Sequence, residues 1–275
     1  MPGDPRPIGI FDSGMGGLTV LRALVAKLPD ECFVYLGDTA RLPYGTKSAE
    51  TVQAYALQAT RLLLDQGVKM LVIACNTASA VSLHVLQEAW APIPVIGVIE
   101  PGARAGVAAT RNRRIAVIAT EGTVRGGAYA RAIQKLMSGV EVVQQPCQVF
   151  VALAEEGWTD SPATLAAARH YLAPLFEGPA APDTLVLGCT HFPVLAEAIR
   201  ETIGEAVVVV DSAETTAQAV AEVLVAAGLG NTAELSGAVR FLATDSPERF
   251  ARVGAIFLGR GIDPGSVELV DLRAL

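Results

Sequence analysis

The same short phrase occurs twice in this chain, each time where an apolar stretch ends. Residues 71–77 read LVIACNT, and residues 185–191 read LVLGCTH. An apolar run of this length, bounded by polar residues, predicts a strand buried in a parallel sheet. Cys75 and Cys189 then lie at the carboxyl ends of their strands, where open α/β sheets bind their ligands. These two strand ends constrain the fold more than any other feature.

Runs of strand length alternate with helical patterns along the whole chain. Strands are expected at residues 7–11, 31–36, 71–75, 95–99, 115–119, 140–144, 185–189 and 207–210. Such alternation predicts parallel sheets with helices on both faces, which is an α/β fold. Because the second half of the chain loosely repeats the first, we expect two Rossmann-like domains in a pseudo-symmetric arrangement. They would place the two cysteines across one cleft, the expected active site.

Composition and charge limit the classes of protein to which this chain could belong. With 275 residues, of which 51% are hydrophobic, the chain can bury the core of one large or two modest domains. No apolar run reaches the roughly 20 residues that a membrane helix needs, and the N-terminal residues have no signal-peptide pattern. We therefore expect a cytoplasmic protein with free thiols and no membrane partner. A net charge of -7 argues against nucleic acid as a partner.

Polar loops follow the first two expected strands and lie at the same edge of the sheet. The first loop covers residues 12–17 and reads DSGMGG. A glycine-rich turn of this kind brings backbone N–H groups close to a ligand. Asp12 is either a site residue or the cap of the following helix. The second loop, residues 37–46, contains Tyr44 and Gly45.

Two thiols that face one cleft suit a reaction in which a stereocentre is inverted. One thiolate removes a proton from carbon, and the other thiol donates a proton to the opposite face. A thiol pKa of roughly 8.5 needs only modest tuning for this work near neutral pH. Asp12 is the candidate neighbour that tunes Cys75, and His191 is the candidate for Cys189. The donors available to a substrate carboxylate are Ser13, Asn76, Thr77, Thr190 and the backbone at Gly45.

Other interpretations of these residues stay open. Buried cysteines are often small core residues, although the matched positions of these two argue against that role. Cys75, Cys189 and His191 could ligate a metal, but the chain has no C-x-x-C pair and its other histidines fall in helical patterns. A pyridoxal cofactor needs a lysine, and only Lys47 lies near an expected site loop. The favoured reaction therefore uses no metal and no cofactor.

A set of longer motifs is distributed along the chain in a fixed order. They are FDSGMGGLTV (11–20), GDTARLPYGTKS (37–48), ACNTAS (74–79), GVIEPG (97–102), GTV (122–124), LGCTHFP (187–193) and VDSAETTA (210–217). Each motif alone is modest, but together they resemble the bacterial glutamate racemases of the aspartate/glutamate racemase family.

This resemblance implies a function and a set of roles. The family interconverts L- and D-glutamate without a cofactor and supplies D-glutamate for peptidoglycan. By motif, Cys75 and Cys189 would each be the base for one enantiomer. Asp12, His191 and Glu155 would assist them, with Glu156 as the alternative to Glu155. The residues that would bind the substrate or tune the thiols are Asp12, Ser13, Tyr44, Gly45, Asn76, Thr77, Thr190 and His191.

The resemblance also implies an organisation into domains and subunits. Residues 1–97 and 212–275 would form the first α/β domain, and residues 98–211 would form the second. We expect a homodimer that takes a small-molecule substrate, glutamate, and holds no metal.

Three alternative classes of protein would carry different residues from those of this chain. The aspartate racemases begin with Gly-Met-Gly-Pro and carry Glu after the second Cys-Thr, whereas this chain has Gly17 and His191 there. A decarboxylase of the same superfamily keeps one cysteine, and this chain has both. A two-domain binding protein would close on an amino acid without chemistry, and it would have no need of paired thiols.

Overall fold

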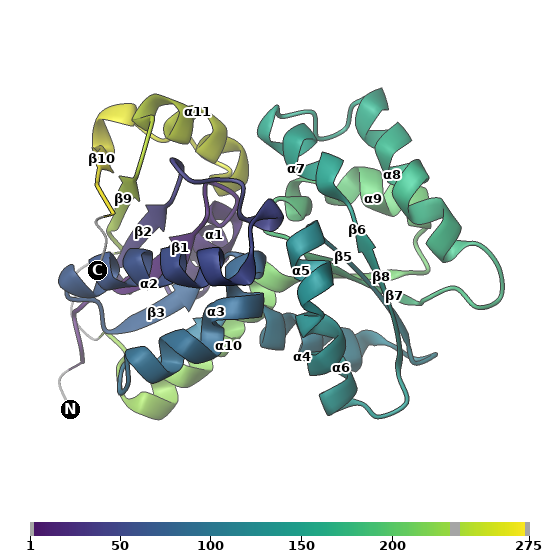
Figure 1. Ribbon diagram of the computed structural model, residues 1–275, viewed down its shortest axis with the longest axis horizontal. Helices are drawn as coiled ribbons and strands as arrows, with labels where there is room; N and C mark the ends of the chain where they lie inside the picture. The colour runs from purple at the N-terminus through teal and green to yellow at the C-terminus, as the bar shows by residue number, and fades with distance from the viewer. Residues whose placement is uncertain (1–2, 232–236, 273–275) are drawn as a thin grey trace.

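The computed structural model describes residues 3–231 and 237–272, and it contains two lobes, each built around a sheet (Figure 1). The parts of the predicted first-domain range at 1–2, 232–236 and 273–275 lie outside the described residues. Within the described chain, both sheets are wholly parallel and are covered by helices. The predicted α/β class with two parallel sheets is therefore confirmed.

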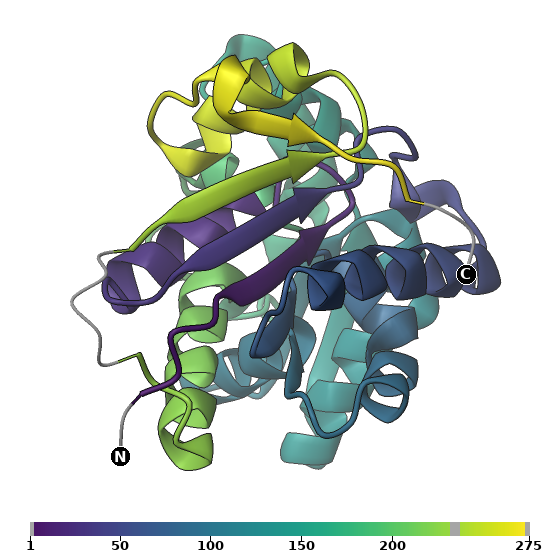
Figure 2. The same ribbon diagram turned by 90° about the vertical axis from the view of Figure 1, so that its left-hand side faces the viewer.

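The larger sheet contains six strands of the described chain. In chain order they are β1 (Ile8–Asp12), β2 (Phe33–Gly37), β3 (Met70–Ile73), β4 (Val95–Gly97), β9 (Val239–Ala243) and β10 (Val267–Leu269). They lie in the order β10-β9-β2-β1-β3-β4, and the parallel run of strands faces the viewer in Figure 2. β1 therefore lies inside the sheet, next to the strand that precedes Cys75.

The smaller sheet contains four strands of the described chain. They are β5 (Arg114–Ala119), β6 (Glu141–Pro146), β7 (Thr184–Gly188) and β8 (Val208–Asp211), in the order β6-β5-β7-β8. β7 precedes Cys189 and pairs with β5, just as β3 pairs with β1. Because parallel strands end at one edge of a sheet, Cys75 lies beside the turn after β1, and Cys189 lies beside the turn after β5.

Five helices of the described chain cover the two faces of the larger sheet. They are α1 (Leu18–Lys27), α2 (Ala49–Asp65), α3 (Asn76–Ala89), α10 (Ser212–Ala227) and α11 (Pro247–Leu258). On β1, Phe11 points into the core beneath α2 and α3, whereas Ile8 and Ile10 belong to the core on the α1 side. Successive residues of a strand face opposite ways, so both faces of this sheet are buried.

The smaller sheet is covered by the helices of the second lobe. They are α4 (Ile99–Ala109), α5 (Glu121–Gly126), α6 (Ala128–Leu136), α7 (Gln148–Glu155), α8 (Pro162–Phe176) and α9 (Ala196–Ile203). Three short 3-10 helices complete the described elements: η1 (Tyr44–Thr46), η2 (Phe192–Leu195) and η3 (Pro264–Ser266).

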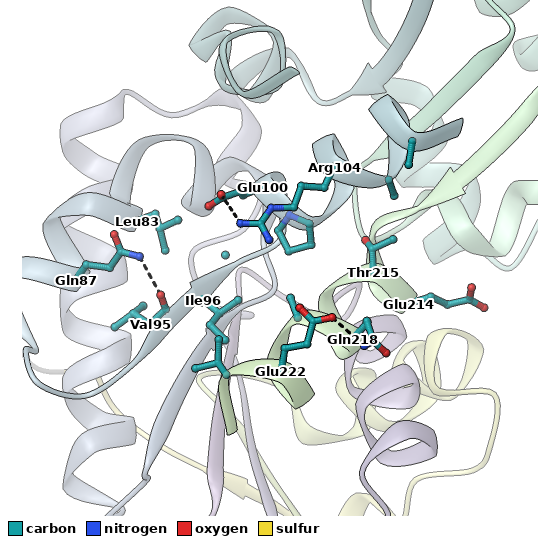
Figure 3. Close-up of a pocket in the computed structure, with 16 residues that line it drawn as sticks. Leu83, Gln87, Val95, Ile96, Glu100, Arg104, Glu214, Thr215, Gln218 and Glu222 are labelled. Carbon is teal, nitrogen blue, oxygen red and sulfur yellow. Dashed lines mark hydrogen bonds and ion pairs between the residues drawn. The ribbon is translucent and has the colours of Figure 1, made fainter. Parts of the chain in front are cut away.

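The chain passes between the two sheets twice, from β4 into α4 and from β8 into α10. α4 and α10 pack against each other at these crossings. The domain boundaries at 97/98 and 211/212 stay a prediction. A cavity of about 690 Å³ lies between α3, β4, α4 and α10 (Figure 3). Its rim carries the ion pair between Arg104 and Glu100, and neither Cys75 nor Cys189 lines it.

Some elements differ from the sequence-based expectation. The helical pattern of α4 is hidden by Pro101 and Gly102, yet proline is tolerated in a first helical turn because its missing N–H would be unpaired there. Strands β9 and β10 were not expected either, and β10 is a short edge strand. None of the helices in the described ranges combines the length and apolar character needed to cross a lipid bilayer.

Candidate active site

Both strand-end cysteines line one small cavity between the lobes. Cys75 follows β3 and caps α3: its Sγ accepts a hydrogen bond from the Ala78 N–H at 3.4 Å. Cys189 follows β7, and each of the two cysteines is 5% exposed. The cavity has a volume of about 50 Å³. The structure therefore brings together two thiols that are far apart in the sequence.

Every predicted site residue except Asp12 lines this cavity. From the side of the larger sheet come Ser13, Gly14, Leu42, Pro43, Tyr44, Gly45, Cys75, Asn76 and Thr77; from the smaller sheet come Thr120, Gln148, Val151, Glu155, Cys189, Thr190 and His191. Thr120, Gln148 and Val151 were not expected at the site from the sequence. The position of Thr120 directly after β5, equivalent to that of Ser13 after β1, was the available signal.

Cys75 lies in a buried, polar neighbourhood. Its thiol donates a hydrogen bond to Ser13 Oγ at 3.4 Å. Burial, followed by the charge of Asp12, raises the pKa of Cys75 to about 12, although its hydrogen bonds with Ser13 and Ala78 act to lower it. Cys75 therefore carries its proton at neutral pH.

Asp12 is fully buried, and its charge acts on the Cys75 thiol. It does not cap the following helix, because α1 begins after Gly17 at the N-cap. Its Oδ2 accepts a hydrogen bond from the Gly14 N–H at 2.9 Å, whereas Oδ1 has no hydrogen-bond partner within the described residues. Burial raises the pKa of Asp12, opposed by the charge of His191 and by nearby backbone N–H groups.

Cys189 begins a line of polar groups that leads out of the cavity. Its Sγ lies 3.8 Å from Nδ1 of His191, and Nε2 of His191 lies 3.2 Å from Oε1 of Glu155. The other oxygen of Glu155 accepts a hydrogen bond from Nη2 of Arg249 at 2.7 Å. Glu156, the alternative to Glu155, is exposed. Arg249 was not nominated from the sequence.

The charges along this line determine the protonation of the imidazole. Burial lowers the pKa of His191, but its hydrogen bonds to Cys189 and Glu155 outweigh burial and raise the pKa to about 10. His191 is therefore an imidazolium at neutral pH. Burial raises the pKa of Glu155, but His191 and then Arg249 overcome it and hold that pKa below its usual value.

Further polar groups of the cavity wall are the amide of Asn76 and the hydroxyl groups of Thr77 and Thr120. Asn76 Oδ1 accepts a hydrogen bond from Tyr129 Oη at 2.8 Å, which orients the amide. Its Nδ2 is buried and has no hydrogen-bond partner in the part of the chain that the structure describes. Thr77, Thr120 and Thr123 form a cluster with Oγ–Oγ distances of 3.0, 3.1 and 3.3 Å.

A buried carboxylate holds the loop that carries Tyr44 and Gly45. Asp38 accepts hydrogen bonds from Tyr44 Oη, from Arg41 Nε at 2.6 Å and from Thr244 Oγ1 at 2.9 Å. The last contact ties the loop to the end of β9. The wall of the cavity therefore depends on a strand near the C-terminus.

Glycines allow the two lobes to approach closely around the cavity. A Cβ atom on Gly16 would lie 2.4 Å from Nδ1 of His191, and one on Gly122 would lie 2.7 Å from the carbonyl oxygen of Gly45. From the sequence, the backbone of the glycine-rich turn was expected to lie close to a ligand. In the structure, the space beside Gly16 is occupied by an imidazole of the other lobe.

A metal interpretation was open at the sequence level. Within the residues described, no group of three or more His, Cys, Asp and Glu side chains is arranged to hold a metal ion.

Comparison with known proteins gives a consistent result. The pattern of the family described as Asp/Glu/Hydantoin racemase matches residues 8–220. A glutamate racemase of Geobacter metallireducens is 52% identical over 269 residues, which cover 98% of each chain. The structure of a glutamate racemase isoform from Bacillus anthracis matches with a TM-score of 0.91 and 38% identity, over 97% of this chain and 98% of that one. A Francisella tularensis glutamate racemase, solved with D-glutamate, has the same TM-score and identity, over 99% and 100%.

The α/β fold, the strand-end cysteines and this match define the class of the molecule. The chain belongs to the Asp/Glu/Hydantoin racemase family. It is an amino-acid racemase, which is an isomerase, and the similar proteins just described are glutamate racemases.

Proposed function

We propose that this protein interconverts L- and D-glutamate without a cofactor, with Cys75 and Cys189 as the two acid–base groups. The observation that carries the proposal is that both thiols line one cavity, each with its own titratable neighbour. The names of the similar racemases support glutamate as the substrate, and one of them was solved with D-glutamate.

The unpaired polar atoms of the site fit an α-amino acid. Asp12 Oδ1 is a buried acceptor without a partner among the described residues, and although Asp12 does not line the cavity in this structure, we propose that it accepts the α-ammonium group. Asn76 Nδ2 is a buried donor without a partner in the same range, and it suits a carboxylate. The carboxylate would also lie at the N-terminus of α3, where the helix dipole favours a negative charge. Thr77 and Thr190 supply further hydroxyl donors.

Proton transfer between the substrate and two thiols balances without another reactant. One thiolate takes the Cα proton, and the electron pair of the broken C–H bond delocalises into the α-carboxylate. The opposite thiol then gives its proton to the other face of Cα. The first sulfur is now a thiol and the second a thiolate, which is the state that accepts the product enantiomer in the reverse reaction.

Each thiol needs a partner that adjusts its protonation. We assign Asp12 to Cys75, because this buried carboxylate acts on that thiol through its charge. We assign His191 to Cys189, with Glu155 rather than Glu156 behind the imidazole. Ser13, Tyr44 and Gly45 would complete the substrate contacts on the side of the larger sheet.

Solvent-proton exchange tests this function. Purified protein would be incubated with L-glutamate in deuterated water, without added pyridoxal phosphate. The enantiomers would then be separated by chiral chromatography, and the deuterium content of each would be measured by mass spectrometry. We expect D-glutamate with deuterium at Cα. Unlabelled L-glutamate as the only species would overturn the proposal, and aspartate would be tested next in the same assay.

Variants of the thiols test the mechanism in the same assay. Cys75→Ala and Cys189→Ala should each lower kcat/KM by roughly 100- to 10,000-fold, because inversion needs an acid and a base. The two enantiomers have equal free energy in water, so the fall must be the same in both directions. Near-wild-type turnover in either variant would contradict the two-thiol mechanism, and Cys32→Ala is the matched control.

A wider role follows from the proposed reaction. D-Glutamate is a component of peptidoglycan, so we propose that the protein supplies it for cell-wall synthesis in the cytoplasm. The homodimer stays a prediction, which light scattering of the purified protein would test.

A further inference from the structure

Helix α11 reaches the candidate active site from the opposite lobe. It packs on α1 and β10 beside the larger sheet, whereas α7 belongs to the lobe of the smaller sheet; the two helices face each other across the gap in Figure 1. Nη2 of Arg249 on α11 lies 2.7 Å from Oε2 of Glu155 on α7. The ring of Phe257, also on α11, meets the His191 ring edge-on, with centroids 4.9 Å apart.

A further contact shows that one face of α11 points toward α7. Ile256 lies two helical turns after Arg249 and therefore shares its face. Its Cδ1 would lie 3.4 Å from a Cβ atom on Gly157, at the end of α7. The ion pair of Arg249 is thus part of a broader contact between the lobes.

The opposite rim of the cavity is also closed by a contact between lobes. A Cβ atom on Gly45 would lie 2.9 Å from the side chain of Thr120, and Gly122 lies against the carbonyl of Gly45. Between the rims, the cavity of about 50 Å³ holds only a few water-sized groups. Entry of a substrate as large as glutamate therefore requires the lobes to separate, which would break the contact between Arg249 and Glu155.

We propose that Arg249 is a positioning residue for racemisation, which sets Glu155 behind His191 when the lobes close over the substrate. This inference rests on the proposed function. Arg249 occupies one carboxylate oxygen of Glu155, and the other oxygen is thereby directed at His191 Nε2. Closure of the lobes over the substrate and orientation of the His191 imidazole beside Cys189 would then occur together.

The exposure of Arg249 argues against a role in stability. Its side chain is 40% exposed, and ion pairs at such positions contribute little to folding because water screens them. A misplaced catalytic partner, in contrast, can slow a reaction by roughly 100-fold. Loss of Arg249 should therefore be visible in turnover and almost invisible in thermal unfolding.

The experiment compares Arg249→Gln and Arg249→Lys with wild type. Arg252→Gln is the matched control, because Arg252 is an exposed arginine on the same helix. We expect Arg249→Gln to lower kcat/KM by roughly 10- to 100-fold, with a change in Tm below about 3 °C. Arg249→Lys should recover part of the rate, since it restores the positive charge without the planar group.

Kinetic isotope effects identify which half-reaction is slowed. With Cα-deuterated glutamate, the isotope effect should rise for the enantiomer that Cys189 deprotonates, because that proton transfer becomes slower. It should fall for the other enantiomer, for which reprotonation by Cys189 becomes limiting. A general loosening of the fold would not separate the two enantiomers in this way.

The pH profile gives an independent readout. The charged and titratable groups that face this line are Cys189, His191, Asp12, Glu155 and Arg249. Arg249 helps to hold the pKa of Glu155 down, so its loss raises that pKa. The acid limb of kcat/KM, where Glu155 takes up a proton, should therefore move to higher pH in Arg249→Gln and stay in place in Arg252→Gln.

The outcomes separate the inference from the proposed function. Wild-type protein that exchanges no deuterium would overturn the proposed function and this inference with it. Active wild-type protein with unchanged rate, isotope effects and acid limb in Arg249→Gln would overturn the positioning role alone. A large fall in Tm, with equal isotope effects for both enantiomers, would also overturn it.

Discussion

At the scale of single residues, the two thiols have chemically different neighbours. Cys75 is under the influence of the buried carboxylate of Asp12, whereas Cys189 has the imidazole of His191 beside it. Burial keeps Cys75 protonated at neutral pH, and His191 is an imidazolium there. The two lobes are thus pseudo-symmetric, but the two proposed acid–base groups have different surroundings. In the proposed reaction each thiol acts on one of two mirror-image substrates, so the two need not be equivalent.

The partner of His191 can be tested through the alkaline limb of activity. His191 has a raised pKa of about 10, so it holds its proton below that pH and loses it as the pH rises through that value. Glu155→Gln removes a group that raises this pKa. The alkaline limb of kcat/KM should therefore move to lower pH, and the rate near neutral pH should fall by roughly 10- to 100-fold. A pH–rate profile in both directions measures the shift.

The exposed neighbour Glu156 provides the control for that measurement. Glu156→Gln should leave the alkaline limb where it is in wild type, since this side chain is exposed to solvent. A limb that moves in Glu156→Gln and not in Glu155→Gln would reverse the assignment of the two carboxylates.

At the scale of elements, the turns after the strands hold the site. Cys75 is both a cavity residue and the N-cap of α3, so the helix begins where the thiol is needed. Asp38 after β2 holds Tyr44 and is itself bound by Thr244 after β9. Each of these loops is short and tied by hydrogen bonds, which fixes side chains that regular elements alone would not place.

The glycine-rich turn after β1 provides a test at this scale. In Gly16→Ala, the added Cβ would lie 2.4 Å from His191 Nδ1 and 2.6 Å from Thr190 Oγ1, so the imidazole must move. We expect a fall in kcat/KM of roughly 10- to 100-fold. Steady-state kinetics with both enantiomers measures it. Gly126→Ala is the control, because the nearest atom to its added Cβ lies 3.7 Å away. Equal rates in the two variants would mean that the turn adapts without cost.

At the scale of the whole molecule, a buried ion pair joins distant parts of the first lobe. Lys69 Nζ lies 2.6 Å from Glu31 Oε2, and both side chains are almost fully buried. Lys69 also donates a hydrogen bond to the carbonyl of Asp4, and Glu31 Oε1 accepts one from the Asn231 N–H. The pair thus ties the N-terminal segment and the segment after α10 to the amino ends of β2 and β3.

Breaking this pair should destabilise the fold without touching the site. Lys69→Met leaves a buried carboxylate unpaired, which costs about 3–5 kcal/mol of unfolding free energy. Urea unfolding followed by circular dichroism measures the change. Adding Glu31→Gln to Lys69→Met should recover part of the loss, because it removes the charge. Arg61→Met, in an exposed pair with Asp65, should change stability by less than about 0.5 kcal/mol. Equal effects of Lys69→Met and Arg61→Met would contradict this role.

Most of the architecture could be predicted from local patterns. The apolar runs ending at Cys75 and Cys189 predicted the two strands and the edge at which the thiols lie. α4 was missed because Pro101 and Gly102 break the helical pattern. Gly102 lies against Tyr129, so the glycine permits close packing of α4 rather than ending it. Edge strand β10 has too few residues for a periodic pattern.

The sequence by itself determined the strand–helix order and the residues that end each strand, because those depend on periodicity over a few neighbouring positions. The resemblance then indicated which of these residues share a site. Only the tertiary structure decided that Gly16 makes room for His191 and that Arg249 meets Glu155. In the sequence, Arg249 is one of three charged residues in α11, with Glu248 and Arg252. Its partner lies on another lobe, and contacts between lobes depend on how two complete cores pack together, which no local pattern records.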